Sequence, residues 1–433
     1  MLYKILCELD IYIQLEYNNI RFNTNNCNNL KYMIHKFSFK NFYSFKDEAV
    51  INFEVNSKAP KTDAYIHDGQ KNNLTKVLTV MGPNASGKTN LLKVLPFLQF
   101  FIVGSFQQNP DDKIPVKQFL FDENNDPSEF SVEFEIDKKI YEYSLIVSDD
   151  KIIKEILKVK DIGRFSTLFK REWSEKTQKY LSSLKNYGLP SNFVGLLRKN
   201  ASIISTGNQV NHPLSVSIVE YWKKIQTNVV EAGRVFRSFL DVELFKVSEY
   251  FYKNPQLKEK AQNLLLKFDL GLSGIDIKEQ KSPNKDESEL FYVPVGIHKN
   301  LNDNKNPKTL QFIYESGGTR NLFLILFKVL NALENGSIVV FDEFDADLHP
   351  SMIPELINLF ISPVFNKKNA QIFFSTHHPH ILNSLDKYQV VLVEKDENGC
   401  SESWRLDEIE GVRSDDNYYA KYMSGAYGAT PRF

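Results

Sequence analysis

Three nearly continuous hydrophobic runs stand out in the chain, and each is only five or six residues long. They occupy residues 77–81, 337–341 and 371–376, and polar or turn-forming residues follow each run directly. Short apolar runs bounded in this way are typical of strands that are buried on both faces of a parallel sheet. The pattern therefore predicts an α/β core that is built on a mixed or mainly parallel sheet.

A second pattern, the alternation of apolar and polar residues, marks the first third of the chain. Residues 34–53 predict two strands, and residues 130–136 and 140–146 predict a hairpin whose turn lies at 137–139. Such alternation is typical of antiparallel strands with one buried face. We therefore expect an antiparallel N-terminal subdomain.

Strand signals fade between residues 151 and 282, where long segments of mixed charge show helical spacing. Residues 219–225 and 257–269 are the clearest examples. The spacing of their apolar residues predicts amphipathic helices. The sequence therefore indicates a mainly helical insertion at 151–282.

The last third of the chain returns to strand patterns. Residues 290–298 and 309–314 predict strands, and residues 321–334 predict an apolar helix that ends at Gly336, a suitable C-cap. A chain of 433 residues is too long for one compact core. We expect four parts: a low-complexity extension at 1–32 ahead of a possible start at Met33, an N-terminal lobe at 33–150, the insertion at 151–282 and a C-terminal lobe at 283–433.

Composition places the chain among ordinary globular proteins. Hydrophobic residues make up 42% and charged residues 25%, and the formal net charge of −1 argues against a general binder of polyanions. The three cysteines form no C-x-x-C pair, which argues against a zinc site. The best membrane candidate, residues 95–103, is too short to cross a bilayer and contains Pro96 and Gln99. We expect a cytoplasmic protein that does not enter the membrane.

Positive charge is concentrated in one part of the chain. Residues 151–230 hold 14 Lys and Arg against 5 Asp and Glu, a net charge of +9. Aromatic residues are interleaved with them, namely Phe165, Phe169, Trp173, Tyr180, Tyr187 and Phe193. This combination is found on surfaces that bind nucleic acid or an acidic partner. It is also typical of solvated helix faces over a local aromatic core, and both interpretations stay open.

The motif with the most specific spacing follows the first apolar run. Residues 82–89, GPNASGKT, fit the G-x-x-x-x-G-K-[ST] phosphate-binding loop (P-loop), and they stand between a predicted strand and a predicted helix. Backbone amides of such a turn and the positive end of the helix dipole bind phosphate. Lys88 would reach the β- and γ-phosphates, and the Thr89 hydroxyl would hold Mg²⁺. The residues expected to contact ATP here are Gly82, Asn84, Ala85, Ser86, Gly87, Lys88, Thr89 and Asn90.

Two adjacent carboxylates, Asp342 and Glu343, follow the second apolar run. Open α/β sheets bind ligands at the C-terminal ends of their strands. We therefore expect Asp342 to hold, through water, the Mg²⁺ that Thr89 also binds, and Glu343 to orient or deprotonate the attacking water. His377 follows the third run, where it could reach the γ-phosphate. The expected catalytic residues are Glu343, His377 and Lys88.

A second anion-binding end is predicted farther along the chain. Ser316, Gly317 and Gly318 stand directly before the predicted helix at 321–334. Small residues at a helix N-terminus expose backbone amides that can bind phosphate. Since the P-loop already cradles one triphosphate, this end would cap the γ-phosphate bound to another subunit. An ordinary helix cap explains the same residues, so the motif is weak in isolation.

Two weaker candidates accompany these motifs. Phe42, Tyr43 or Phe45 could lie against the nucleotide base, although aromatic residues are at least as often part of a core. Gln118 could sense the metal ion, but a single glutamine in a polar loop is weak evidence, and an ordinary loop residue is favoured.

The P-loop, the Ser-Gly-Gly motif, the Asp-Glu pair and His377 occur in an order that resembles the ABC-type ATPases, in particular their SMC-like and OLD-like branch. Residues 39–45, 348–350 and 422–429 resemble one subgroup of that branch. This subgroup comprises AAA-family ATPases of bacterial abortive-infection and anti-phage systems, similar to RloA and the AbiL ATPase and related to the PARIS ATPase. The resemblance covers nearly the whole chain after Met33 and is least specific in the insertion.

The resemblance implies that the lobes at 33–150 and 283–433 form an ATPase head that dimerises, or assembles further, around Mg·ATP. Ser316 and Gly318 would act on the nucleotide that Lys88 of a second copy binds. An associated effector is also implied, commonly a Toprim-type nuclease that the ATPase holds or licenses. The combination describes an ATP-hydrolysing sensor or regulatory subunit of a phage-defence complex.

Two residues depart from the ABC pattern. Thr319 stands where many ABC proteins have Gln, and His349 stands where many have the aspartate of the D-loop. Hydrolysis could therefore be slow or conditional.

Three other functions are also compatible with parts of the sequence. The first is an SMC-like DNA-processing ATPase whose basic segment contacts nucleic acid, although the chain has no long heptad segment. The second is a transporter subunit, which the large insertion and the lack of a membrane segment disfavour. The third is a scaffold that hydrolyses ATP only when triggered.

Overall fold

The structure is a computed structural model that describes residues 32–67, 73–121, 126–160, 163–234, 237–268, 271–281, 290–300, 306–346 and 348–431. The extension expected at 1–32 lies outside the described residues except for Tyr32, which begins the first strand.

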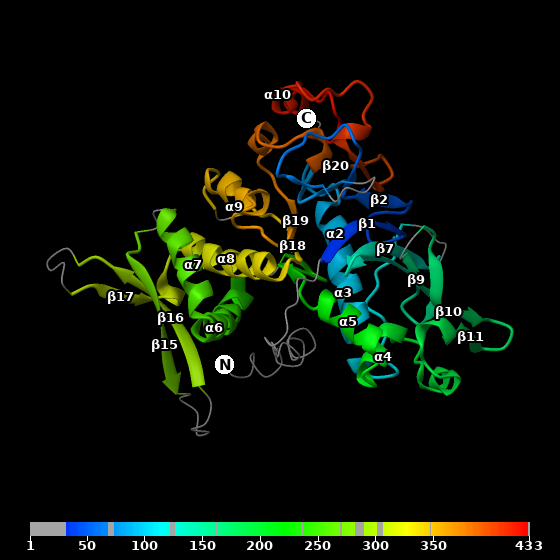
Figure 1. Ribbon diagram of the computed structural model, residues 1–433. Helices are drawn as coiled ribbons and strands as arrows, with labels where there is room; N and C mark the ends of the chain where they lie inside the picture. Colours follow the sequence, from blue (N-terminus) through cyan, green and yellow to red (C-terminus); the bar gives the residue numbers. More distant parts are fainter. Residues whose placement is uncertain are drawn as a thin grey trace.

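A six-stranded sheet forms the centre of the molecule, and five of its strands are parallel (Figure 1). In spatial order its strands are β12 (Gln226–Thr227), β18 (Ile338–Phe341), β19 (Gln371–Ser375), β6 (Val77–Met81), β20 (Val390–Lys395) and β21 (Ser401–Arg405). Every residue of β6, β18 and β19 is buried. The prediction of three central strands in a parallel core is therefore confirmed.

Helices pack around this sheet and in the lobes beside it. They are α2 (Lys88–Leu92), α3 (Val94–Gly104), α4 (Ile203–Gln209), α5 (Pro213–Trp222), α6 (Arg237–Lys253), α7 (Pro255–Lys267), α8 (Gly317–Asn335), α9 (Met352–Ile361) and α10 (Tyr418–Met423). The predicted helices at 219–225, 257–269 and 321–334 correspond to parts of α5, α7 and α8. Gly336 ends α8 in the left-handed conformation, as expected of a C-cap.

Both faces of the central sheet are covered, since the side chains of each strand alternate between two hydrophobic clusters. On β6, Leu78 and Val80 belong to the cluster that contains the buried residues of α2 and α3. Val77 and Met81 belong to the cluster that contains those of α8 and α9. Cover on both faces explains why the strands are apolar throughout rather than alternating.

A second sheet is antiparallel and has seven strands. In spatial order they are β11 (Lys179–Ser183), β10 (Ser166–Ser174), β9 (Ile152–Lys160), β8 (Lys139–Val147), β7 (Ser128–Ile136), β1 (Tyr32–Lys40) and β2 (Ala49–Asn52). Asp137 and Lys138 join β7 to β8 with φ values of 53° and 65°, a pair of left-handed residues that suits a two-residue hairpin turn. The predicted N-terminal strands and hairpin are therefore confirmed.

The helical interpretation of residues 151–282 is wrong for its first part, because β9, β10 and β11 extend the antiparallel sheet. Ile152, Glu155 and Leu157 are the buried residues of β9, and Phe169 and Arg171 are those of β10. Two inward positions therefore carry charged side chains. A pattern of apolar residues cannot reveal a strand when its buried positions are charged.

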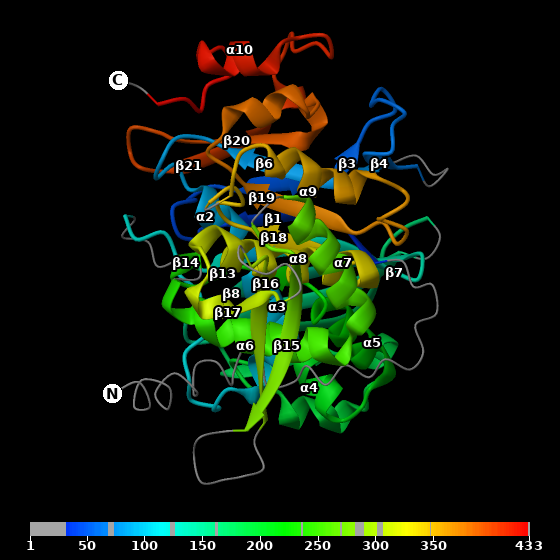
Figure 2. The ribbon, with the colours of Figure 1, turned by 90° about the vertical axis from the view of Figure 1, so that its left-hand side faces the viewer.

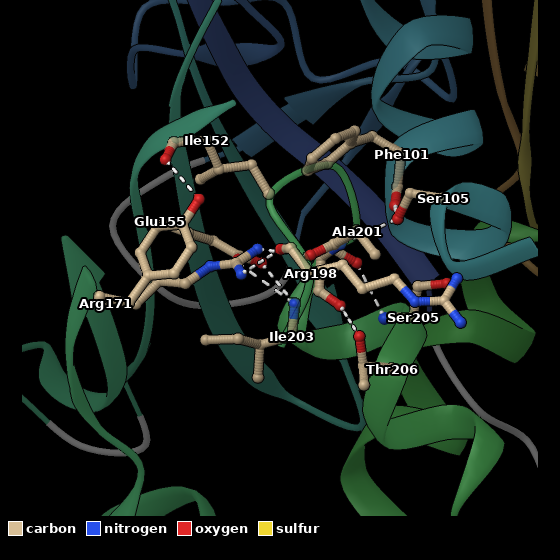
Figure 3. Close-up of polar contacts among 12 residues, drawn as sticks. Phe101, Ser105, Ile152, Glu155, Arg171, Arg198, Ala201, Ile203, Ser205 and Thr206 are labelled. Atoms are coloured by element: carbon tan, nitrogen blue, oxygen red, sulfur yellow. Dashed lines mark hydrogen bonds and ion pairs between the residues drawn. The ribbon is translucent and has the colours of Figure 1, made fainter. Parts of the chain in front are cut away.

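The buried ion pair between Glu155 and Arg171 ties this sheet to the chain that enters α4 (Figure 3). Both side chains are 0% exposed, and the Arg171 Nε donates to a Glu155 carboxylate oxygen at 2.7 Å. Arg171 also donates to the carbonyls of Arg198 and Ala201, and the backbone N–H of Ile203 donates to Glu155. A buried charge pair needs such additional partners, because each ion has lost its water.

The remaining strands are short or belong to a separate lobe. They are β3 (Glu54–Val55), β4 (Tyr65–Ile66), β5 (Asn73–Thr75), β13 (Val229–Val230), β14 (Gly233–Arg234), β15 (Gly274–Lys281), β16 (Leu290–His298) and β17 (Lys308–Gln311). The strand predicted at 309–314 is shorter than expected, since Phe312–Tyr314 form a 3-10 turn.

The lobe that contains β15, β16 and β17 lies apart from the seven-stranded sheet. Figure 1 shows the two on opposite sides of the central strands, and Figure 2 views the molecule from the side of this lobe, with β15 and β16 in front. Within this lobe α6 packs on β16, and both α6 and α7 pack on α8. The helix that carries the Ser-Gly-Gly motif is therefore part of this lobe's core.

His35 of β1 is a buried cation that joins three strands. Its Nδ1 lies 3.2 Å from Glu54 of β3, and its Nε2 lies 3.1 Å from Glu135 of β7. Burial opposes the charged form, but the hydrogen bonds and charges of the two carboxylates outweigh it and raise the pKa of His35 to about 9.

We predict that replacing Arg171 by Leu lowers the free energy of unfolding by about 3–5 kcal/mol, because the Glu155 carboxylate remains buried without its cation. Urea denaturation followed by circular dichroism measures the change. The double change of Glu155 and Arg171 to Leu should recover most of the loss. Lys170→Ala, in an exposed pair next to Arg171, is the control and should shift stability by less than about 0.5 kcal/mol. Equal losses for Arg171→Leu and Lys170→Ala would contradict this account.

We also predict that stability falls as pH rises from about 6.5 to about 9. The pKa of His35 is higher in the folded than in the unfolded state, so its contribution is complete below pH 6.5 and is lost as pH passes through about 9. The expected loss is on the order of 3 kcal/mol. Urea titrations across this range should show a shallower slope for His35→Gln. Parallel pH profiles for the two proteins would rule out His35 as the cause.

Candidate functional site

The P-loop joins β6 to α2, and its glycines are required by close contacts. A side chain on Gly82 would clash with the carbonyl oxygen of Val393, and one on Gly87 would clash with the hydroxyl of Ser401. Gly87 also has a φ of 113°, which side chains rarely tolerate. The structure thus places the loop against β20 and β21, with Asn84 and Ala85 exposed at its tip.

Lys88 lies folded across this loop. Its Nζ donates to the carbonyls of Gly82 and Pro83 at 2.9 and 2.8 Å. Burial lowers the pKa of Lys88, and the nearby carboxylates of Asp342 and Glu343 oppose that effect. The ammonium group is therefore a partly desolvated cation that an anion in the loop would stabilise.

The loop fits a nucleotide phosphate by the chemistry of its groups. Among the described residues, the buried hydroxyl of Ser86 has no hydrogen-bond partner, and Lys88 supplies a positive charge beside it. The loop also leads into the N-terminus of α2, where backbone N–H groups lack helical partners. An unsatisfied hydroxyl, a cation and free amides are the donors that phosphate oxygens accept.

The predicted metal ligands lie in contact. Asp342 follows β18 and is 3% exposed, and Thr89 donates its hydroxyl to the Asp342 Oδ2 at 2.7 Å. The hydroxyl of Ser375, at the end of β19, donates to the Asp342 Oδ1 at 2.6 Å. A hydroxyl and a carboxylate in this arrangement are oxygen ligands of the kind that Mg²⁺ prefers. Ser375 was not predicted, because a serine that ends a strand carries no motif.

Glu343 has an unusual backbone conformation beside the predicted metal ligands. Its φ is 46°, and its backbone N–H donates to the hydroxyl of Ser375 at 2.8 Å. A positive φ is uncommon in residues other than glycine, and such strained backbone often occurs at functional sites. The carboxylate lies 3.9 Å from the Nε2 of His377 and 2.9 Å from the Nη1 of Arg234. The structure therefore brings the predicted pair, Glu343 and His377, together and adds Arg234.

The segment after β12 supplies residues that the sequence analysis missed. The Asn228 side chain accepts from the backbone N–H of Asp342 at 2.7 Å and donates to its carbonyl at 2.9 Å. A two-residue strand leaves no pattern in the sequence, so only the pairing of β12 with β18 identifies Asn228 as a neighbour of the site.

Gln118, the weak candidate for metal sensing, donates its side-chain amide to the carbonyl of Asp126.

The aromatic residues near the N-terminus divide between core and site. Phe42 and Phe45 are buried in the main hydrophobic cluster, which is the alternative that we left open. Tyr43 is half-buried, and the ammonium group of Lys93, the N-cap residue of α3, lies 3.9 Å from the centre of its ring. Burial, and then the charge of Glu231, raise the pKa of Tyr43 to about 12. Tyr43 is therefore the candidate that remains for contact with a base.

A hydroxyl network braces the P-loop from behind. Asn90 donates to the hydroxyl of Ser44 at 2.9 Å, and the Ser401 hydroxyl donates to the carbonyl of Ser86 and can accept from the Ser44 hydroxyl, which lies 2.8 Å away. Asn90 thus has a structural role in the described contacts, and its predicted contact with ATP stays a prediction.

The Ser-Gly-Gly motif caps α8 and faces outward. Ser316 is exposed and accepts from the backbone N–H of Thr319 at 3.1 Å, while the Cβ position of Gly317 faces open space. The residues before it are unusually exposed for apolar side chains, with Ile313 at 42% and Tyr314 at 71%. Within one chain the motif is the helix cap that we left open as an alternative, and its action on a second copy stays a prediction. The Gly318 backbone is part of the same turn.

Most of the described aromatic residues of the basic segment serve internal packing. Phe169, Tyr187 and Phe193 are buried. The ammonium groups of Lys151 and Lys199 lie 5.2 and 4.9 Å from the ring of Trp173. The interleaving of basic and aromatic residues therefore builds cation–π contacts within the chain.

One helical stretch of the described residues, Lys88–Gln107, is long and apolar enough by composition to cross a membrane, although the sequence analysis expected none. It begins in the P-loop, and its residues Leu91, Leu95 and Phe101 are buried in the main cluster. These contacts identify it as the core helix pair α2 and α3.

Fold and site together define an α/β P-loop NTPase of the ABC-ATPase type, as the sequence predicted. Residues 77–383 match the family described as "AAA domain, putative AbiEii toxin, Type IV TA system". The match covers more than half of the chain and includes the P-loop, Ser316, Asp342 and His377. The chain belongs to this family.

Curated relatives are similar over shorter stretches. The chain is 22% identical over 270 residues to "Structural maintenance of chromosomes protein 3 homolog" of Plasmodium falciparum (isolate 3D7) and 25% identical over 192 residues to "Retron Ec83 probable ATPase" of Escherichia coli. These stretches are 60% and 41% of this chain but only 22% and 33% of the relatives, so the chain spans a third or less of their length.

Solved structures of SMC head domains align with most of the chain at low similarity. The SMC head domain from Thermotoga maritima has a TM-score of 0.39 and 14% identity, and covers 86% of this chain and 98% of its own. The SmcHead bound to the C-winged helix domain of ScpA has a TM-score of 0.43 and 14% identity, with 87% and 98% covered.

Proposed function

We propose that this protein binds and hydrolyses ATP as the regulatory or sensor subunit of a bacterial phage-defence complex. The observation that carries the catalytic part is the hydrogen bond between Thr89 and Asp342, which joins two motifs 253 residues apart at one site. Glu343 and His377 lie at its edge. These groups are the parts that phosphoryl transfer to water requires.

Each residue has a defined task in this proposal. Lys88 binds the terminal phosphates, and Thr89 and Asp342 hold Mg²⁺, which when bound neutralises phosphate charge. Glu343 orients the attacking water and accepts its proton, while His377 stands within reach of the same carboxylate. Ser375 holds the Asp342 carboxylate and the Glu343 backbone, because its hydroxyl donates to Asp342 and accepts from the Glu343 N–H.

The surface around Ser316 supports the proposed homodimer or higher homo-oligomer. The helix N-terminus is open, and the side chains of Ile313 and Tyr314 beside it are exposed to solvent. In the proposal, Ser316, Gly317 and Gly318 of one copy reach the nucleotide bound by Lys88 of another. Binding energy from ATP then drives association, because ligand that prefers the assembled state shifts the population toward it. The substitution of His349 for the usual aspartate makes slow or conditional hydrolysis part of this proposal.

The defence role draws on the family description and on the retron relative. We infer that the protein acts in the cytoplasm and controls an associated effector such as a Toprim-type nuclease. The closer resemblance to RloA, the AbiL ATPase and the PARIS ATPase is part of this proposal.

An SMC-like DNA-processing ATPase is the second candidate, and the excess positive charge of residues 151–230 favours it. Binding to phosphate backbones through these residues should weaken steeply as salt is raised. The internal contacts of Arg171, Lys151 and Lys199 leave fewer cations for such a surface. Electrophoretic shifts with DNA and RNA at two salt concentrations distinguish the candidates.

We predict that Glu343→Gln binds Mg·ATP but hydrolyses it at least about 100-fold more slowly, because the amide cannot accept a proton from water. Phosphate release measures turnover, and calorimetry measures binding. Lys88→Ala should lose nucleotide binding itself. Lys113→Ala, which alters an exposed ion pair, is the matched control and should match the wild type in both assays. Equal turnover by Glu343→Gln and the wild type would remove Glu343 from its assigned role.

A further inference from the structure

In the described structure, Arg234 is hydrogen-bonded to the proposed catalytic glutamate, Glu343. Its Nη1 donates to the Glu343 Oε2 at 2.9 Å. The Arg234 side chain is only 23% exposed, and that of Glu343 is 45% exposed. Arg234 ends β14, far from every motif in the sequence, and it has no role in the mechanism given above.

Several contacts fix the segment that carries Arg234 over the P-loop. Asn228, at its start, is bound to the backbone of Asp342 by two hydrogen bonds. Glu231 forms an ion pair with Lys117 at 3.3 Å and accepts from the hydroxyl of Tyr43 at 3.4 Å. The Cβ position of Gly233, the residue before Arg234, lies 3.5 Å from the Thr89 methyl group. Arg234 therefore projects from a backbone that already touches the predicted metal ligand.

The Arg234–Glu343 pair is poorly suited to hydrolysis as it stands. The Glu343 oxygen that accepts from the guanidinium is occupied by that hydrogen bond, so it is not available to accept a hydrogen bond from water. A phosphate bound at Lys88 and Thr89 adds negative charge beside the same guanidinium. Arginine presents five donors in a planar fork that fits phosphate as well as carboxylate. The two anions therefore compete for one cation.

We propose that Arg234 binds the terminal phosphate of ATP within its own chain and, in exchanging partners, releases Glu343 to act on water. The inference rests on the proposed ATP site and adds a residue to it. Arg234 then distinguishes ATP from ADP, since ADP lacks the phosphate that draws the guanidinium from Glu343. It also keeps Glu343 paired until a triphosphate is bound, so Glu343 does not activate water before ATP occupies the site.

The first test compares equilibrium binding of ADP and of a non-hydrolysable ATP analogue, both with Mg²⁺, by calorimetry. Arg234→Ala should weaken binding of the analogue by roughly 10- to 100-fold and leave ADP binding unchanged. Arg234→Lys should be intermediate, because lysine keeps the charge without the fork. Arg164→Ala removes an exposed arginine two residues before β10 and is the matched control. It should bind both nucleotides like the wild type.

The second test measures the exchange itself with a double-mutant cycle. Glu343→Gln should tighten binding of the analogue in the wild-type background, partly because Arg234 is no longer held by a carboxylate. The same change should tighten binding less in the Arg234→Ala background. Equal tightening in both backgrounds would show that the two residues do not exchange partners and would overturn the proposal.

The outcomes separate this inference from the proposed function. If the wild-type protein binds neither nucleotide, the ATPase assignment fails and the inference fails with it. If the wild type binds and hydrolyses ATP while Arg234→Ala keeps the wild-type ratio of ATP-analogue to ADP affinity, only the inference is wrong. If Arg234→Ala lost binding of both ADP and the ATP analogue, the inference would also be overturned, since Arg234 would then support the structure of the site instead of recognising the terminal phosphate.

Discussion

The proposed site depends on one hydrogen bond, between the hydroxyl of Thr89 and the buried carboxylate of Asp342. A carboxylate that is almost fully buried must be satisfied by donors, and Thr89 and Ser375 supply one to each of its oxygens. Ser375 ends β19, and Thr89 lies in α2, directly after the P-loop that follows β6, so the contact needs β18, β19 and β6 to be neighbours. The order of the central sheet is thereby linked to the chemistry of the site.

The layers around the sheet serve this arrangement in different ways. One face is covered by α2 and α3 and by the antiparallel sheet, whose outer strands are attached through the Glu155–Arg171 pair. The other face is covered by α8 and α9, and α8 carries Ser316 at its exposed end. Since α8 packs with α6 and α7, any movement of that lobe relative to the central sheet would move Ser316 relative to Lys88. The phosphate site and the outward-facing end of α8 therefore lie on different parts of the fold.

Sequence reasoning succeeded where the signal was local. The three central strands are continuous apolar runs, and the P-loop and the Asp342-Glu343 pair are contiguous in sequence, so each could be predicted without knowing the fold. It failed for β9 and β10, because Glu155 and Arg171 occupy buried positions that the pattern expects to be apolar. It also missed Asn228, which follows a strand of two residues, and Arg234, which lies in another, because both contact the site across more than a hundred residues of the chain.

The central claim is that Thr89 and Asp342 hold one metal ion together, and a double-mutant cycle on Mg·ATP affinity tests it most directly. Thr89→Val, Asp342→Asn and the double variant are compared by calorimetry with and without Mg²⁺. If both residues bind the same ion, each single change removes most of the Mg²⁺-dependent affinity, and the double change costs little more than either. Additive losses, or losses that persist unchanged without Mg²⁺, would show that the two residues act separately and would contradict the account.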